Sequence, residues 1–343
     1  MKLLFIVGAT PPIPCGVGDQ VYKLSKYISE KFEAEVILFT YFNLKLESSK
    51  KFKVYTFFNS KLRFYLKLIY ILIKERPNAV HFSYPNRGFT FSYPFGMILF
   101  LKIFVKRTIV TFHEDIKSEN RLNRFLIKKL PDQIVIVREE LAEKIGLKRY
   151  ITITNFSSIP VSAISEGERN EINIKIAKGK LLCGHFGFVA PQRGVDQLLD
   201  ILDAEKYHLI IIGSLLNDEY SQLLQKKIWK RKWLGNVTIT GYISDYLVAD
   251  LLYACDLVIL PFKNGAHEAN TSTKAVSLQG TYLVTTSFDR YGYDSKRNTY
   301  FVQPDNPDQL RGALSMEIRK FPKGEVHDDS IDIISDKYYK LLT

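Results

Sequence analysis

Short apolar runs alternate with amphipathic stretches along the first half of the chain. Runs of this kind are typical of buried parallel strands, because both faces of such a strand are shielded from water. They predict strands at residues 2–9, 34–42, 52–58, 77–85, 107–113, 132–137 and 149–156. Between some of them apolar residues recur at every third or fourth position, which predicts helices at residues 18–32, 61–76 and 118–130.

The same alternation restarts in the second half of the chain. It predicts strands at residues 179–188, 207–213, 236–243, 256–262 and 281–287, and helices at residues 194–202, 218–233, 245–255 and 272–279. Residues 156–173 separate the two series; they are polar, rich in serine and without a period, so we interpret them as a linker. Two successive α/β series predict two doubly wound domains, whose ligands bind beyond the carboxyl ends of the strands.

Composition is compatible with two domains of ordinary size, since the chain has 343 residues and is 46% hydrophobic. In the apolar segment at residues 89–107, the longest uninterrupted apolar run, residues 95–101, is far shorter than the about 20 residues that span a bilayer. The first 16 residues show no signal-peptide pattern. Cys15, Cys183 and Cys255 are too far apart in the sequence for a disulfide framework or for the spacing of metal ligands. We therefore expect the protein to reside in a reducing cytoplasm.

The net charge of +12 is distributed unevenly along the chain. Residues 1–160 contain 26 of the 48 lysines and arginines but only 13 of the 36 acidic residues, which leaves 22 basic and 23 acidic residues in the remainder. This asymmetry indicates an anionic partner for the first half: nucleic acid, a membrane surface or an acidic substrate. The alternative is a general preference of the source genome for lysine.

Glycines precede the first predicted helix in the loop of residues 8–19, GATPPIPCGVGD. Gly16 and Gly18 would let backbone amides approach a ligand closely at the helix start. The loop is too long and too rich in proline for a dinucleotide-binding fingerprint, and G-x-G-x-x-G is missing. A plain glycine-rich turn entering a helix is the alternative interpretation.

Titratable and cationic residues follow two other predicted strands. His113, with Glu114 and Asp115 after it, comes at the end of the strand at 107–113, where an imidazole or carboxylate is placed to handle a hydroxyl proton. A surface-loop histidine is the alternative. Arg193 precedes Gly194 at a predicted helix start, where a guanidinium, free amides and the helix dipole all favour an anion.

Small hydrogen-bonding residues are concentrated at the start of the last predicted helix of the second series, in the segment PFKNGAHEANTSTKAVSLQG at residues 261–280. Asn270 or Thr271 is a candidate N-cap, and the remaining hydroxyls and amides, including those of Ser272, would be free for phosphate oxygens. Glu268 lies just upstream on the same loop. Simple capping needs only one of these residues, so their number favours an anion site.

The order of these segments resembles that of retaining glycosyltransferases of the GT-B fold, specifically the large family 4. The similar segments are CGVGDQV, VHFSYP, TFHED, HFGFVAPQRGVDQLLDIL, LIIIGS, VTITGYIS, YACDLVILPF and TSTKAVSLQGTYLVTTS. The resemblance implies two Rossmann-like doubly wound domains facing across a cleft. Residues 1–160 would bind the acceptor and residues 161–325 the nucleotide sugar, and residues 326–343 are similar to the family's last helix, which crosses back to the first domain.

The resemblance also implies roles for single residues. Gly16 and Asp19 would lie toward the acceptor and Gly18 toward the donor phosphates. His113 matches the histidine of the family's T-x-H segment, near the transferring sugar. Arg193 takes the place of a lysine that neutralises the donor diphosphate.

Further donor contacts would come from two loops of the second half. Gly241 and Tyr242 would neighbour the nucleotide base. Asn270, Thr271 and Ser272 would lie against the diphosphate at the helix start.

Two departures from the family pattern change these expectations. An arginine often follows the glycine of a G-R segment in the family, and this chain has Phe188 there. The diphosphate would then depend on Arg193 and backbone amides, with Lys263 or Lys274 as further cations.

The second departure concerns a pair of glutamates that many family members carry eight residues apart. The corresponding positions here are His267 and Ala275. Glu268 is one residue from the first of them and is the candidate for the sugar contact, so His113 and Glu268 are the candidate catalytic residues.

The implied function is metal-independent and cofactor-independent transfer of a hexose from a nucleotide sugar to a glycan or lipid-linked acceptor. It would retain the anomeric configuration and serve cell-surface polysaccharide synthesis. Cationic groups and helix dipoles can stabilise the departing nucleoside diphosphate without a metal ion. Two alternatives are a non-hydrolysing nucleotide-sugar epimerase, for which Asp115 and Glu268 are the available carboxylates, and a non-catalytic protein that binds sugar nucleotides or polyanions.

Charge then suggests where the protein acts. Arg63, Lys67 and Lys74 lie near one face of the helix at 61–76, so the first domain would dock on an anionic membrane to reach a lipid-linked acceptor. The alternative is a core helix with a solvated basic edge. Basic residues are scattered and no RNA-binding motif is present, so we expect no nucleic-acid partner. The expected location is the cytoplasm, at the inner face of the membrane.

Overall fold

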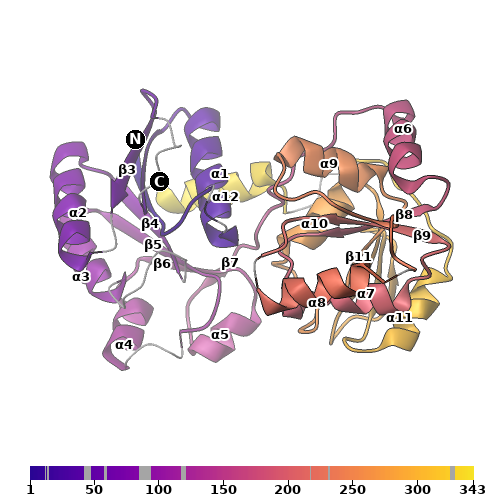
Figure 1. Ribbon diagram of the computed structural model, residues 1–343. Helices are drawn as coiled ribbons and strands as arrows, with labels where there is room; N and C mark the ends of the chain where they lie inside the picture. The colour runs from indigo at the N-terminus through magenta and orange to yellow at the C-terminus, as the bar shows by residue number, and fades with distance from the viewer. Residues whose placement is uncertain are drawn as a thin grey trace. The chain divides into compact units, whose positions relative to one another are not determined.

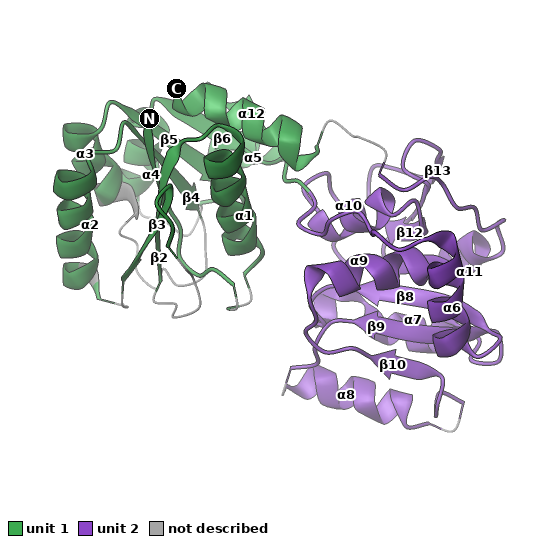
Figure 2. Ribbon diagram, turned by 90° about the horizontal axis from the view of Figure 1, so that it is seen from above, with its two compact units in different colours: residues 1–156, 328–343 green, residues 157–327 purple. Residues whose placement is uncertain are grey.

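The computed structural model describes residues 1–11, 13, 15–41, 48–57, 60–84, 94–116, 121–216, 218–230, 232–324 and 329–343. The chain forms two compact units (Figure 2). Unit 1 comprises Met1–Phe156 and Asp328–Thr343, and unit 2 comprises Ser157–His327. The predicted domain boundary between residues 325 and 326 lies outside the described residues, as do the ends of the predicted strands at 42, 58 and 85 and the first residues of the predicted helix at 118–130.

Unit 1 is built on a parallel sheet (Figure 1), whose strand order is β3-β2-β1-β4-β5-β6-β7 in the described part of the chain. The strands are β1 Lys2–Ile6, β2 Glu35–Tyr41, β3 Phe52–Phe57, β4 Ala79–Tyr84, β5 Arg107–Phe112, β6 Gln133–Ile136 and β7 Ile151–Thr152. The order reverses beside β1, so the loops after β1 and β4 flank the switch point where such sheets bind ligands.

Helices cover both faces of this sheet. They are α1 Gly16–Lys31, α2 Lys61–Glu75, α3 Pro94–Phe104, α4 Arg121–Lys129, α5 Glu140–Ile145 and α12 Ile331–Leu342. Helices α2 and α3 lie on one side of the sheet, and α1 and α12 lie on the other (Figure 2). This division follows from right-handed crossovers, because the chain moves along the sheet in opposite directions through α1 and through α2 and α3.

The last helix belongs to unit 1 although it follows unit 2 in sequence. Ile334, Tyr338 and Leu342 of α12 are buried in the same core cluster as Leu24 and Ile28 of α1. The rings of Phe32 and Tyr339 stack at 3.9 Å, and Lys31 Nζ lies 2.8 Å from carboxylate oxygens of both Asp332 and Asp336. Apolar burial and these ion pairs fix α12 against α1.

Unit 2 repeats the architecture with the strand order β10-β9-β8-β11-β12-β14-β13 among the described residues, with β13 alone antiparallel to its neighbour. The strands are β8 Leu181–Phe186, β9 Tyr207–Ile212, β10 Val237–Ile239, β11 Leu257–Leu260, β12 Tyr282–Thr286, β13 Gly292–Asp294 and β14 Thr299–Val302. The helices are α6 Glu166–Ala177, the 3₁₀ helix η1 Pro191–Arg193, α7 Val195–Ile201, α8 Glu219–Ile228, α9 Asp245–Ala254, α10 Thr271–Leu278 and α11 Pro307–Leu314.

Both faces of the unit 2 sheet are buried, which explains the continuous apolar runs. In β9, Leu209 and Ile211 lie in one core cluster, and Ile210 and Ile212 lie in the other. Successive side chains of a strand point to opposite faces, so a strand covered on both sides must be apolar throughout. The predicted α/β architecture is therefore confirmed.

The interpretation of residues 156–173 as a linker is wrong for its second half, because α6 begins at Glu166. The Ser165 hydroxyl accepts a hydrogen bond from Glu168 N, and the Glu168 carboxylate accepts one from Ser165 N. This capping box starts a helix whose apolar residues show almost no helical periodicity. The sequence signal that could have predicted the helix was its S-x-x-E pattern. Among the described residues no helix is long and apolar enough to cross a membrane.

Candidate functional site

The carboxyl end of the unit 2 sheet brings several loops into direct contact. A Cβ added at Gly213, after β9, would lie 2.3 Å from the carbonyl oxygen of Gly187, after β8. A Cβ added at Gly194 would lie 2.2 Å from the carbonyl oxygen of Pro261, after β11, and Gly194 has a φ of +68°. Lys263 N donates to the Gln192 carbonyl at 3.0 Å. Backbone packing therefore holds η1 and the start of α7 against the end of β11.

Arg193 projects from η1 at this edge. Its guanidinium carbon lies 4.9 Å from the centroid of the Phe262 ring, a cation–π contact that orients the side chain. Burial lowers the pKa of Arg193, and no described carboxylate pairs with it. A partly buried guanidinium without a counter-ion favours an anionic ligand, because the ligand would offset the cost of burying the charge.

Of the two lysines expected near the phosphates, Lys274 is buried in α10 and Lys263 has an acidic partner. Lys263 Nζ lies 3.7 Å from the Asp196 carboxylate, which also accepts a hydrogen bond from Tyr220 Oη at 2.7 Å. His185 lies fully buried in β8, its Nδ1 3.1 Å from the carbonyl oxygen of Ile259. Burial lowers the pKa of His185 to about 4, so at neutral pH it adds no positive charge beside Arg193.

The start of α10 is not capped in the way that its sequence suggests. Asn270 is the N-cap residue, but its side chain makes no capping hydrogen bond to the helix. Instead, Asn270 Oδ1 accepts from His267 N at 3.0 Å, and Thr273 Oγ1 donates to the Asn270 carbonyl at 2.8 Å. Thus the Asn270 side chain shapes the preceding loop, and the first amides of α10 are left to another acceptor.

Thr271 and Ser272 form the first turn of α10; Ser272 is buried and Thr271 is partly exposed. Glu268 is exposed on the same loop, and its carboxylate lies 2.7 Å from Arg290 Nη2. Gly241 has a φ of +68° in the loop after β10, and Tyr242 beside it is exposed. These predicted donor-site and sugar-contact residues therefore lie in loops or in the first turn of α10, at the carboxyl end of the unit 2 sheet.

In unit 1 the loop after β1 packs tightly onto the start of α1. Gly18 is buried, and a Cβ there would lie 1.7 Å from the Ala9 carbonyl oxygen, whereas nothing lies within 4 Å of a Cβ added at Gly16. Cys15 is the N-cap, and its Sγ accepts from Gly18 N at 3.5 Å. Asp19 pairs with Lys23 at 3.2 Å. Packing alone therefore requires glycine at 18 but not at 16; Pro12 and Pro14 of this loop lie outside the described residues.

His113 follows β5 and borders a small cavity of about 20 Å³ within unit 1. His81, Ser83 and Tyr338 also line this cavity. His113 Nε2, His81 Nδ1 and Ser83 Oγ are buried there without a hydrogen-bond partner among the described residues. Burial lowers the pKa of His113 to about 4, so the imidazole is neutral at pH 7.

A buried polar chain connects this cavity to the last helix. His81 Nε2 lies 2.8 Å from Thr111 Oγ1, which in turn lies 3.1 Å from Tyr338 Oη on α12. Sequence analysis did not single out His81, Ser83 or Tyr338. The available signal was weak: a histidine and a serine within the otherwise apolar strand AVHFSY.

His81 makes the stability of the protein depend on pH. Burial lowers its folded-state pKa to about 3, below the ordinary value of about 6.5, so the unfolded chain binds more protons between these values. The stability that the buried neutral His81 contributes is present above about pH 6.5 and is lost as the pH falls toward 3. Between pH 7 and pH 5 we expect the free energy of unfolding to fall by about 2 kcal/mol. Urea unfolding at both pH values measures it. His81→Gln should reduce the pH dependence by that amount, and an unchanged dependence would contradict the assignment.

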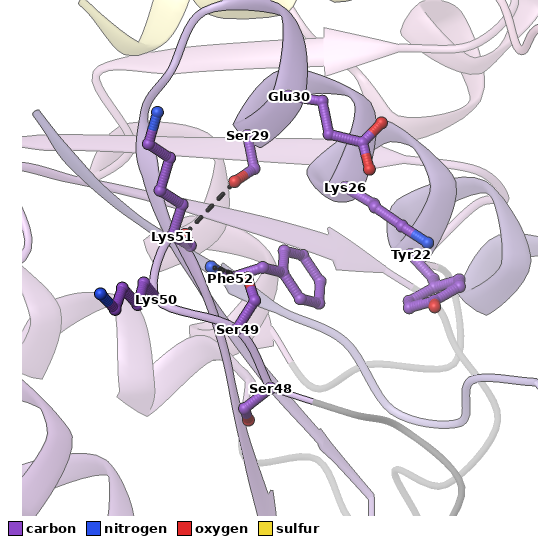
Figure 3. Close-up of a pocket in the computed structure, with 9 residues that line it drawn as sticks. All are labelled: Tyr22, Lys26, Ser29, Glu30, Ser48, Ser49, Lys50, Lys51 and Phe52. Atoms are coloured by element: carbon purple, nitrogen blue, oxygen red, sulfur yellow. Dashed lines mark hydrogen bonds between the residues drawn. The ribbon is translucent and has the colours of Figure 1, made fainter.

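A larger groove of about 610 Å³ lies between the second half of α1 and the segment that enters β3 (Figure 3). Lys26 and Glu30 project from α1, and Lys50 and Lys51 come from the segment before β3 (Figure 3). None of the predicted site residues lines this groove. No three or more acidic, histidine or cysteine side chains come together as a metal site anywhere in the described ranges.

Comparison with known proteins gives the arrangement a family context. Residues 168–285 match the family model described as Glycosyl transferases group 1. A GDP-mannose:glycolipid 4-beta-D-mannosyltransferase from Xanthomonas campestris pv. campestris is 30% identical over 103 residues, which are 29% of this chain and 28% of that protein. The match therefore spans little more than a quarter of the curated relative.

Solved structures resemble the chain over nearly its whole length. A glycosyltransferase from Rickettsia africae superposes with a TM-score of 0.75 at 13% identity, covering 99% of this chain and 97% of that one. HepE from Anabaena, solved in complex with UDP-glucose, gives a TM-score of 0.65 at 15% identity, covering 99% and 94%. The chain thus has the GT-B fold, and its residues 168–285, which include Arg193 and the start of α10, carry the sequence pattern of glycosyl transferases group 1.

Proposed function

We propose that the protein transfers a sugar from a nucleotide-sugar donor to a glycan or lipid-linked acceptor in the synthesis of cell-surface polysaccharide. The observation that carries the proposal is the pairing of two features at the carboxyl end of β11. Arg193 is a partly buried cation without a described counter-ion, and the α10 helix start is not capped by its own N-cap side chain. Together they offer a charged fork and helix amides to a diphosphate.

The chemistry needs this kind of charge stabilisation. When the bond between the sugar C1 and the diphosphate oxygen breaks, negative charge develops on the leaving oxygen. Preorganised donors aimed at such charge usually make the largest contribution to catalysis. In this proposal Arg193 and the first amides of α10 supply those donors, and no metal ion is required.

His113 and Glu268 are the proposed groups nearest the sugar. A neutral His113 can exchange hydrogen bonds with sugar hydroxyls without placing a second positive charge beside the developing oxocarbenium ion. Glu268 is held by Arg290, so its carboxylate would reach a hydroxyl group from a fixed position. Gly241 and Tyr242 would border the nucleotide base, and Gly16 and Asp19 the acceptor.

The nucleotide is best identified by binding. One relative is named as a GDP-mannose-dependent mannosyltransferase, and one similar structure holds UDP-glucose, so the test compares uridine, guanosine and adenosine diphosphates and their sugars. A ligand at 100 times its dissociation constant should stabilise the folded protein by about 2.7 kcal/mol, which raises the melting temperature by roughly 5 °C or more. Thermal denaturation measures the shift. If no nucleoside diphosphate raised the melting temperature, the proposed donor site would be wrong.

Transfer and its stereochemistry are separate questions from binding. With the stabilising donor and a membrane extract as acceptor source, labelled sugar should appear in glycan or lipid. We propose retention, on the resemblance to family 4; the one-bond C–H coupling at the anomeric carbon of the product distinguishes it from inversion. Binding without transfer to any acceptor would instead favour a non-catalytic sugar-nucleotide binding protein.

A further inference from the structure

Helix α2 exposes an apolar stripe. Leu62, Leu66 and Ile73 are each more than half exposed, although the opposite side of the helix buries Phe64 and Leu68. Spacings of four and seven residues place the three exposed side chains on one side of the helix. The solvent-facing side of a surface helix is normally polar, so this exposed apolar stripe requires an explanation.

The stripe continues onto the two neighbouring helices. Leu99 and Ile103 of α3 and Leu122 and Phe125 of α4 are also more than half exposed. The helices are contiguous, because the rings of Tyr65 on α2 and Phe100 on α3 lie 6.3 Å apart and α3 packs on α4. We call the exposed outer surface of α2, α3 and α4 the outer face of unit 1.

The opposite side of the sheet has no such surface. Helices α1 and α12, which are described throughout, expose no large hydrophobic residue. Thus the exposed apolar side chains of unit 1 helices are concentrated on one side of the sheet, where Figure 2 shows α2 and α3 side by side. Concentrated exposed apolar surface is typical of a membrane or protein contact rather than of ordinary scattered surface residues.

The charge of the outer face identifies the partner. Arg63 lies on α2, and Arg121, Arg124 and Lys129 lie on α4, none with an ion-pair partner among the described residues. The only acidic residue of the three helices, Glu75, is buried and accepts hydrogen bonds from Lys53 and Tyr55. A second copy of this chain would bring like charges together, whereas an anionic lipid surface complements them.

We propose that unit 1 docks on an anionic membrane surface through its outer face. Apolar side chains such as Leu66, Ile103 and Phe125 would enter the interface between headgroups and acyl chains, and the arginines would contact lipid phosphates. This surface is distinct from the carboxyl end of the sheet, which stays open to substrate. Presentation of a lipid-linked acceptor by the membrane rests on the proposed function, but docking itself does not.

Flotation of the full chain with vesicles tests the proposal. Wild type should bind vesicles containing phosphatidylglycerol, bind pure phosphatidylcholine weakly, and be released by high salt. The triple variant Leu66→Ser/Ile103→Ser/Phe125→Ser should bind at least about tenfold more weakly. Its matched control, Ile174→Ser/Leu216→Ser/Leu234→Ser, changes equally exposed apolar residues of unit 2 and should bind like wild type.

A second pair of variants tests the charge contribution. Arg63→Gln/Arg121→Gln/Arg124→Gln should lower binding to anionic vesicles by about 100-fold at low salt. Lys26→Gln/Lys50→Gln/Lys51→Gln removes the same charge from the groove of Figure 3 and should lower it far less. Equal losses in the two variants would show that net charge alone binds lipid, and would overturn the proposed surface.

Two further outcomes separate the remaining explanations. If the wild-type protein does not bind vesicles and sediments as a dimer, whereas the triple serine variant sediments as a monomer, the outer face is a protein interface and the proposal is wrong. Thermal shifts with nucleoside diphosphates should be the same in wild type and in every docking variant. Vesicle binding without any nucleotide shift would leave docking intact and remove the proposed function.

Discussion

Replacing Arg193 by alanine is expected to weaken binding of a nucleoside diphosphate by about 100-fold and to slow sugar transfer at least as much, because a buried charge-assisted contact is lost. Arg193 is the cation at the end of β11 that has no described counter-ion, and Phe262 holds its guanidinium in place. Lys263 cannot simply replace it, since Lys263 is paired with Asp196. Isothermal titration calorimetry with the stabilising nucleotide measures the loss.

Two control variants make this experiment specific. Arg311→Ala removes an exposed arginine of unit 2 whose described partner is Asp308, and it should bind nucleotide like wild type. Arg193→Lys keeps the charge but lacks the planar fork, and we expect intermediate affinity.

The stability of the free protein gives a separate readout of Arg193. Because burial disfavours the charged form, its loss should change the unfolding free energy by no more than about 1 kcal/mol, the size of the cation–π contact. A large loss of stability without nucleotide, or unchanged nucleotide affinity, would show that Arg193 is a structural residue.

Gly18→Ala is expected to destabilise unit 1 by at least about 3 kcal/mol, because the new methyl group would overlap the Ala9 carbonyl oxygen. The loop cannot easily yield. The Gly8 carbonyl accepts hydrogen bonds from Tyr41 N and Thr40 Oγ1, both at 2.7 Å, and Thr10 is fully buried. Urea denaturation measures the loss.

Gly16→Ala is the matched control, since it adds the same methyl group to the same helix start in open space. It should leave stability nearly unchanged, so an effect of Gly16→Ala on acceptor use would report binding rather than folding. If both variants were as stable as wild type, the close packing of α1 against the loop after β1 would be wrong.

The strands with the clearest apolar runs are those covered on both faces, although the partly exposed edge strands β3 and β10 were also predicted and the mostly buried β14 was not. β1, β9 and β11 read as continuous apolar runs because helices pack on either side of them. The same rule misses segments whose structure depends on a neighbour. β13 is short and pairs only along one edge, and α6 begins from a capping box rather than from an apolar period.

The candidate site shows a similar division. The chemical character of the segment around Asn270 and of the loop holding Arg193 was visible in the sequence, because hydroxyls, amides and a guanidinium at helix starts favour anions. Hydrogen-bond direction was not visible. Asn270 could have capped α10, but in the folded chain its side chain turns back to His267 N.

The sequence by itself determined the alternation of strands and helices, the division into two α/β series and the basic character of the first half. These properties depend on which residues are apolar or charged, and local spacing records that directly. Only the tertiary structure decided that Lys263 has a partner while Arg193 lacks a described one, that Gly18 is sterically required, and that α2 is apolar on its exposed side as well. Such pairings, close approaches and coverings join residues far apart in the chain, so packing rather than local sequence determines them.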